Sequence, residues 1–516
     1  MNKGLKNAAK ATVIMMIMTL ISKSLGFINT ALRASAFGIG MESASYVMAR
    51  TIPLTIFTVI SMALAMVFIP IYTDLTVNES HDKANKFANN IINVVAIIGI
   101  GIVLIGIVFS PFIMKIFSGY KGEQLDLTIN LTKIMFSMVL FILCSYLFSA
   151  LLQANKHFST PAVAPIIFNL TLIIYFVFFQ KKYGIYGLAY ATIIAALFQA
   201  LIQIPVLKKY KYNHKFKVDF KDEYVSKIVI LALPVMIGSG MQELAVIIDR
   251  SMAARLAGGS VAALDYANVV NTFAIGVFGA SIVLVIFPYL SKYAVEKNIE
   301  KMKETLKYAI NLTLLIMVPV AVGIIILRIP VVKILFERKA FTSEATEMTS
   351  SCLLFYAMGL PFIIIRDLFS RIFYSMKKVK IPMYNGIIGL GINVLLIVIL
   401  IKPLGYKGLA LSTALTYFIT MITLGRKINK QLGIINWNDN IVTFIKVITA
   451  SLAMGVGVYS LNNLLVNYLN SSIVEQIILL CIDIISGVII YFILCYLLKI
   501  DELKQLINII KQKVRL

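Results

Sequence analysis

The stretch ASYVMARTIPLTIFTVISMALAMVFIPIYTD, residues 44–74, decides the fold class of this chain. It is apolar almost throughout and is longer than the roughly 20 residues that a helix needs to cross a bilayer. Pro53 and Pro70 interrupt it, and Arg50 lies about one turn before the first proline. A simple anchor needs neither an internal charge nor a break, so the pattern is typical of a bent spanning helix in a protein that moves something polar.

Composition extends this interpretation to the whole chain. Of 516 residues, 59% are hydrophobic, and the mean hydropathy is +0.89. Continuous apolar runs predict an all-α polytopic membrane protein with about fourteen transmembrane helices, the first of them retained rather than cleaved as a signal peptide. The predicted spans are 8–34, 44–74, 84–112, 124–153, 158–180, 184–207, 222–255, 262–293, 303–327, 343–376, 382–402, 406–431, 440–465 and 472–498, with a short amphipathic piece over 330–338.

The net charge of +24 indicates the positive-inside rule and attraction to anionic membrane lipids, rather than nucleic acid. Lysines and arginines cluster in alternate connections, on the same side as the N-terminus, which places both termini in the cytoplasm. The basic segment 328–339 is the exception, because it is predicted outside. The four cysteines lie within apolar runs, and no metal-ligand spacing, nucleotide loop or nucleophile elbow occurs. The sequence therefore predicts a protein that is not an enzyme and has no cofactor or bound metal.

An internal repeat organises the chain. FIPIY at 68–72 returns as IFPYL at 286–290, and YGIYGLAYAT at 183–192 returns as LGYKGLALST at 404–413, at offsets close to 220 residues. Each copy holds six spans, which predicts two six-helix lobes around a midplane cavity. We expect an N-lobe at 1–207, a basic cytoplasmic linker at 208–221, a C-lobe at 222–431, and two extra C-terminal helices with a cytoplasmic tail at 432–516.

Charged residues within the spans are the candidate site. Lys23, Arg50, Arg250 and Arg366 give the spans a small excess of cations, which would suit a phosphate or diphosphate substrate. Other interpretations stay open for each. Lys23 and Arg50 could extend to the membrane interface, Arg250 could form a structural ion pair, and Arg366 could contact lipid phosphate. Asp249, an acid deep in its span, is the candidate for a coupling cation, although it could equally pair with a neighbouring cation.

Several motifs resemble one family. ISKSLGF at 21–27, the FG-x-G run at 37–40, FIPIYTDL at 68–75, VAALDYANVVNTFAIGVF at 261–278, LFERKAF at 335–341 and RIFYSMKKVKIPM at 371–383 are similar to those of the MurJ (MviN) family. These are lipid II flippases of bacterial cell-wall synthesis, within the multidrug/oligosaccharidyl-lipid/polysaccharide exporter superfamily.

The resemblance implies a cationic cavity for the diphosphate–disaccharide–pentapeptide head of lipid II, and a lipid-facing groove made by the two C-terminal helices. It also implies alternating access linked to membrane potential or to an ion gradient, with Na⁺ or H⁺ as the possible coupling ion. The location implied is the bacterial cytoplasmic membrane, where peptidoglycan biosynthesis maintains cell shape and cell-wall synthesis proteins are possible partners.

The match at the cavity positions is incomplete. The family's first cavity arginine falls on Lys23, which keeps the charge, and its second falls on Asn29, which we retain as a substrate-binding candidate. Its span-two arginine falls on Phe57 and its span-eight cation on Val269. These differences leave open a flippase for another undecaprenyl-diphosphate glycan. A cation-coupled drug exporter and a non-transporting scaffold for cell-wall enzymes are further alternatives.

Overall fold

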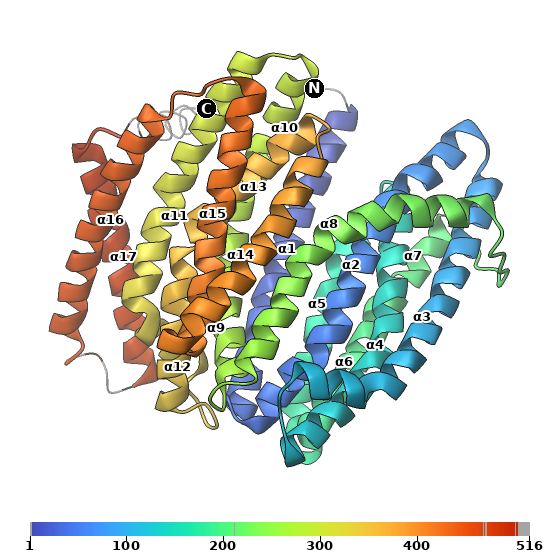
Figure 1. Ribbon diagram of the computed structural model, residues 1–516, viewed down its shortest axis with the longest axis horizontal. Helices are drawn as coiled ribbons and strands as arrows, with labels where there is room; N and C mark the ends of the chain where they lie inside the picture. The colour runs from blue at the N-terminus through green and yellow to red at the C-terminus, as the bar shows by residue number, and fades with distance from the viewer. Residues whose placement is uncertain (1–2, 211, 468, 470–471, 501, 504–516) are drawn as a thin grey trace. The chain divides into compact units, whose positions relative to one another are not determined.

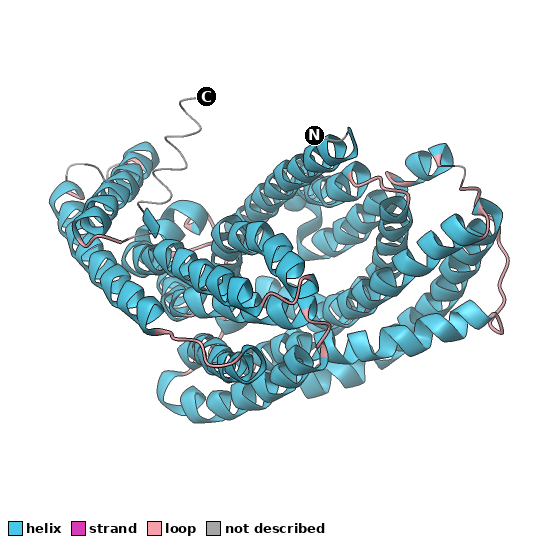
Figure 2. Cartoon of the chain, turned by 90° about the horizontal axis from the view of Figure 1, so that it is seen from above, coloured by secondary structure: helices cyan, strands magenta, loops and turns pink. Residues whose placement is uncertain are grey.

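A computed structural model describes residues 3–210, 212–467, 469, 472–500 and 502–503. Within these ranges the chain is almost entirely helical and has no strand (Figure 2), so the all-α prediction is confirmed. Most of the predicted cytoplasmic tail, from residue 504 onward, and Lys211 of the basic linker lie outside the described residues.

Packing divides the chain into two compact units, Met1–Ala262 and Ala263–Leu516. In the first unit α4 packs against α2, α3 and α6, α1 packs against α5, and α8 lies along α2. By packing, α8 therefore belongs with the helices of the first repeat. The elements are α1 (Lys3–Phe37), α2 (Met41–Asn78), α3 (His81–Phe117), α4 (Gly122–Ala154), α5 (Ser159–Ile174), the π-helix η1 (Tyr175–Phe179), α6 (Gln180–Leu201), α7 (Ile204–Lys209) and α8 (Glu223–Ala253).

The second unit is built around α11, which packs against α10, α12, α13, α16 and α17. The last two helices lie side by side next to α11 (red beside yellow in Figure 1), and they correspond to the two extra C-terminal helices that the sequence predicts. The elements are α9 (Ser260–Ala274), which crosses the division between the units, the π-helix η2 (Ile275–Gly279), α10 (Ala280–Val295), α11 (Ile299–Phe336), α12 (Ser343–Met358), α13 (Leu360–Ser375), α14 (Lys380–Leu404), α15 (Tyr406–Leu432), α16 (Asn438–Leu465) and α17 (Ile473–Leu497).

Length and apolarity identify fewer spans in the described residues than the fourteen that the sequence predicts. Among the described residues, 10 helices are long and apolar enough to cross a membrane, or 11 if α12 and α13, bent by 42°, form one broken span. The predicted count of fourteen is thus not confirmed. One source of the difference is Ser159–Lys209, which counts once, although its backbone turns sharply at Gly184. The break between α12 and α13 falls at Gly359, within the predicted span 343–376.

The separate amphipathic piece predicted over 330–338 was wrong. Pro330 lies inside α11, which continues without interruption to Phe336. A proline removes one backbone donor, but a long helix that is packed on several neighbours can accommodate that loss. Leu327 and Val332, which lie before and after Pro330, are both buried, so α11 is packed on either side of the proline.

The internal repeat is visible in backbone geometry. Gly184 has φ 52° and ψ −145°, and its counterpart Gly405 has φ 57° and ψ −133°. This region is almost exclusive to glycine, which is why both copies of the motif carry glycine there. Lys156 and Lys377, 221 residues apart, both have φ 60°. The two copies therefore make the same turns at matching positions.

Candidate functional site

Two arginines of the first unit meet on one aromatic ring. Arg50 lies one turn after Tyr46 on α2, and its guanidinium carbon is 5.8 Å from the centre of the Tyr46 ring. Arg33, near the end of α1, is 5.9 Å from the same centre. The face of an aromatic ring carries partial negative charge, so it attracts cations at such distances. Tyr46 thus brings two positive charges from two helices into one place.

The ring itself is fixed. Tyr46 is 3% exposed, and its hydroxyl is 2.9 Å from Oγ1 of Thr192 on α6. The Thr192 hydroxyl in turn donates to the backbone carbonyl of Leu188, at 2.8 Å. Thr192 belongs to the repeated YGIYGLAYAT motif, so the sharp turn at Gly184 and the hydroxyl that holds Tyr46 come from the same stretch of sequence.

Arg33 is a residue that sequence reasoning missed. It is 4% exposed, which is rare for an arginine unless its charge is compensated. Its position at the end of the predicted span 8–34 made it resemble an interfacial residue. The available signal was its spacing, because Arg33 follows Asn29 by four residues and therefore shares a helix face with a predicted site residue.

Lys23 and Asn29 lie on α1 and are both half-buried. Lys23 lies ten residues before Arg33, about 15 Å along the helix axis. Beside Lys23 in the chain, the backbone carbonyl of Ser22 accepts a hydrogen bond from Nδ2 of Asn169 on α5, at 3.3 Å. This bond holds α1 against α5. Asn29 is one turn from the arginine pair, whereas Lys23 is two to three turns away.

Asp249 and Arg250 are neighbours near the end of α8, and both are half-buried. Two residues before Asp249, Ile247 joins a buried cluster with Met48 and Ile52, which flank Arg50 on α2. Packing therefore brings this end of α8 to the segment of α2 that carries Arg50. Burial raises the pKa of the Tyr120 hydroxyl, in the connection between α3 and α4, and the positive charge of Arg250 opposes that rise.

Arg366 lies in the second unit, on α13. Its guanidinium nitrogen is 3.1 Å from a carboxylate oxygen of Asp367, and its carbon is 5.2 Å from the centre of the Tyr417 ring on α15. Part of its charge is therefore compensated by its neighbour. A substrate-binding role for Arg366, as for the other predicted residues, stays a prediction.

The position at which the family has an arginine in span two is part of the core here. Phe57 is 1% exposed and packs with Val103, Phe136, Val139 and Leu143 of α3 and α4. A charge at this position would be buried among apolar side chains at high cost. The two arginines that contact Tyr46, Arg33 and Arg50, lie elsewhere on α1 and α2.

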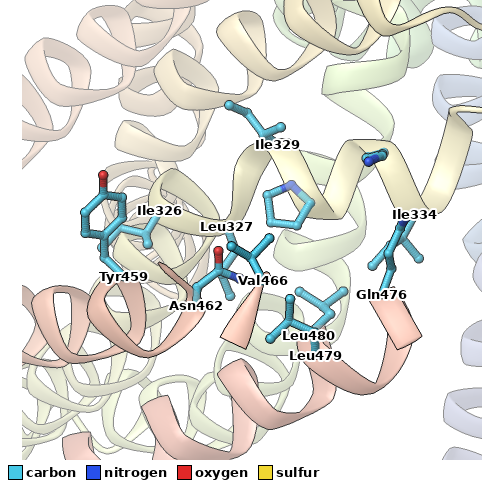
Figure 3. Close-up of a pocket in the computed structure, with 12 residues that line it drawn as sticks. Ile326, Leu327, Ile329, Ile334, Tyr459, Asn462, Val466, Gln476, Leu479 and Leu480 are labelled. Carbon is cyan, nitrogen blue, oxygen red and sulfur yellow. The ribbon is translucent and has the colours of Figure 1, made fainter. Parts of the chain in front are cut away.

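The C-terminal helix pair lines two adjoining cavities within the second unit. One, of about 430 Å³, is bounded by apolar side chains of α9, η2, α11, α16 and α17 and includes Asp483. The other, of about 270 Å³, lies further along α11 and includes Lys333, Tyr459, Asn462 and Gln476 (Figure 3). Ile326 and Leu327 line both cavities. The first cavity is suited to an apolar group, and the second offers polar side chains among mainly apolar ones.

Comparison with known proteins decides the family. The family described as "Lipid II flippase MurJ" matches residues 33–479. This chain belongs to the MurJ family. A MurJ relative from Buchnera aphidicola subsp. Schizaphis graminum, named "Probable lipid II flippase MurJ", is 30% identical over 446 residues, covering 85% of this chain and 86% of its own length. A second MurJ relative, "Lipid II flippase MurJ" of Burkholderia cenocepacia, is 26% identical over 416 residues, covering 79% and 81%.

Solved structures agree with the MurJ assignment at the level of the fold. "Lipid II flippase MurJ, inward closed conformation" superposes with a TM-score of 0.78 at 24% identity, covering 94% of this chain and 98% of that one. A multidrug resistance MATE transporter of the MOP superfamily gives a TM-score of 0.69 at 16% identity, covering 98% of its own chain but only 81% of this one. The family expected from the sequence motifs is confirmed, and the chain is a multi-pass membrane protein.

Proposed function

We propose that this protein moves a polyprenyl-diphosphate-linked glycan, lipid II of peptidoglycan synthesis, from the inner to the outer leaflet by alternating access. The family membership supports the substrate class. The observation that carries the proposal is the Arg33–Tyr46–Arg50 group, two guanidinium groups held on one fixed ring among membrane-spanning helices. Planar guanidinium groups bind phosphate oxygens in a bidentate manner, so a pair of them suits a diphosphate.

The remaining predicted roles fit this proposal. Lys23, Asn29, Arg250 and Arg366 would contribute contacts to the head group, Asp249 would take up a coupling ion, Na⁺ or H⁺, and the apolar cavity beside α16 and α17 would accommodate part of the polyprenyl tail. We also propose that both termini face the cytoplasm, that the basic linker contacts anionic lipid, and that the protein acts as a transporter and not as an enzyme. No group of three or more metal-ligating side chains lies within the described ranges.

A flippase for a different lipid-linked glycan is the second candidate, and a specific observation favours it. The family's span-two cation is replaced by Phe57, which is part of a packed core, and its span-eight cation by Val269. A drug exporter is less well supported, because the MATE fold accounts for 81% of this chain.

Complementation tests the proposal. The chain is expressed in a bacterium whose essential lipid II flippase can be switched off, together with Arg50→Gln and, as a control, Arg426→Gln, which removes the same charge from an exposed position on α15. We expect growth with the native chain and the control, and impaired growth with Arg50→Gln at equal membrane abundance. No growth with abundant native protein would contradict lipid II as the substrate and favour the second candidate.

A further inference from the structure

The C-terminal helix pair contains a carboxyl group in an unusual setting. Asp483 lies near the middle of α17, within an apolar span, and is fully buried. Asn462 of α16 donates from Nδ2 to Oδ2 of Asp483, at 2.5 Å. The second carboxyl oxygen, Oδ1, is buried and has no hydrogen-bond partner in the described part of the protein. Half of this carboxyl group is therefore satisfied, and the other half is not.

Among the residues that the structure describes, no cation lines the cavity that holds the carboxyl group. The titratable residues that line the two cavities are Lys333, Tyr459, Asp483 and Tyr491. Lys333 and Tyr459 line only the cavity further along α11, and the Tyr491 hydroxyl donates to the carbonyl of Leu315, at 2.7 Å. The part of the cavity made by α9 and η2 is apolar, formed by Val270, Phe273, Ala274 and Phe278. None of the ion pairs within the described ranges involves Asp483.

An uncompensated carboxylate in this position would cost several kcal/mol. A bound metal ion is not suited to compensate this negative charge, because hard cations need several oxygen ligands. The site offers only one free carboxyl oxygen, beside an amide that presents its N–H. A proton removes the charge without further ligands. Protonated Oδ1 makes the group neutral, and Oδ2 continues to accept from Asn462. Ionisable side chains within membrane spans are generally functional.

We propose that Asp483 is a proton-binding site and that its occupancy depends on what fills the apolar cavity beside it. One proton moves from water to Oδ1, which converts the carboxylate into the neutral acid, and no other bond changes. When an apolar chain fills the cavity and excludes water, the neutral acid is favoured; when water enters, the carboxylate is hydrated. Binding of an apolar chain then takes up a proton, and by reciprocity a bound proton strengthens chain binding.

The proton site itself rests only on the geometry of Asp483, whereas its link to a lipid chain rests on the proposed function. Infrared difference spectroscopy of the full-length protein in nanodiscs tests the first point. We expect the native-minus-Asp483→Asn spectrum at neutral pH to show the carbonyl band of a protonated carboxylic acid. Asparagine preserves the acceptor for Asn462, so the helix pair remains joined and the unfolding temperature changes little.

The matched control is Asp439→Asn, which removes an exposed carboxylate from the start of α16. Its difference spectrum should show loss of a carboxylate band and no acid band. A carboxylate band in place of the acid band for Asp483→Asn would overturn the proposal and leave Asp483 as a structural contact between helices.

Proton uptake tests the second point. A long-chain polyprenol, which has no titratable head group, is added to the protein in weak buffer containing a pH indicator, at a higher pH at which the infrared spectrum shows Asp483 as the carboxylate. We expect uptake of about one proton per bound chain by the native protein and none by Asp483→Asn. Binding without uptake by the native protein would refute the link. Neither readout depends on lipid II transport, so failure here is distinct from failure of complementation.

Discussion

The Arg33–Tyr46–Arg50 group leads to a prediction in which two substitutions of one residue separate two effects. Tyr46→Phe keeps the ring that both arginines contact and removes only the hydroxyl contact with Thr192. That contact contributes about 1 kcal/mol to stability, and the Thr192 hydroxyl keeps its own acceptor, the Leu188 carbonyl. The Phe variant should therefore be slightly less stable and should still transport.

Tyr46→Leu removes the ring as well. Both cations lie close to the outer limit for this interaction, at 5.8 and 5.9 Å, so each contact contributes about 0.5–1 kcal/mol. Together they amount to about 1–2 kcal/mol that holds the two guanidinium groups in place. If this arrangement binds the diphosphate during transport, losing it should slow transport by a factor of about 5–30.

The assay measures how fast labelled lipid II becomes accessible at the outer face of spheroplasts, normalised to the amount of protein in the membrane. The unfolding temperatures of both variants are measured in parallel, so that loss of folded protein is not mistaken for loss of transport. If Tyr46→Leu transports at the rate of Tyr46→Phe, the ring does not organise the arginines for function and the reasoning is wrong.

Three further predictions concern stability. Burial and the charge of Lys209 lower the pKa of His157, which lies between α4 and α5, so the unfolded chain binds its proton more readily. Stability should therefore fall as pH drops below about 6.5, and it should fall less in His157→Gln; an equal fall in both proteins would contradict this. Asn90 joins α3 to the basic linker through two hydrogen bonds with the backbone of Asp219, of 2.7 and 3.0 Å. Asn90→Ala should therefore lower the free energy of unfolding by about 1–3 kcal/mol and speed tryptic cleavage of the linker in the intact protein. An unchanged cleavage rate would contradict this. Gly184→Ala should lower the unfolding temperature by introducing about 1–3 kcal/mol of backbone strain, whereas Gly101→Ala, in open space within α3, should not lower it.

Local sequence patterns predicted the fold well. The repeat was visible because Gly184 and Gly405 occupy backbone conformations that other residues rarely adopt, so the sequence records the turn directly. The helices of the C-terminal pair were visible because their apolar runs are continuous. The end of α11 was not predicted, since Pro330 ordinarily ends a helix and only packing against neighbouring helices keeps this one intact.

The site was predicted less completely, because burial depends on contacts that lie far apart in the sequence. Arg50 was identified as a charge inside a span, but its partner Arg33 was not, since Arg33 lies where a span ends and only Tyr46 makes its position special. Asp483 was missed as well. The signal was present, because Asp483 is the one acid in the interior of the last apolar run, but its unsatisfied oxygen becomes evident only when α16 is packed beside α17.

The most direct test of the central claim is the appearance of lipid II at the outer face of the membrane after the host flippase is switched off. Spheroplasts with and without this chain are compared, using an external reagent that reacts only with lipid II exposed outside. We predict that exposed lipid II persists when the native chain is present and declines when it is absent or when Arg33 and Arg50 are both replaced by Gln. An equal decline with abundant, folded native protein would contradict it.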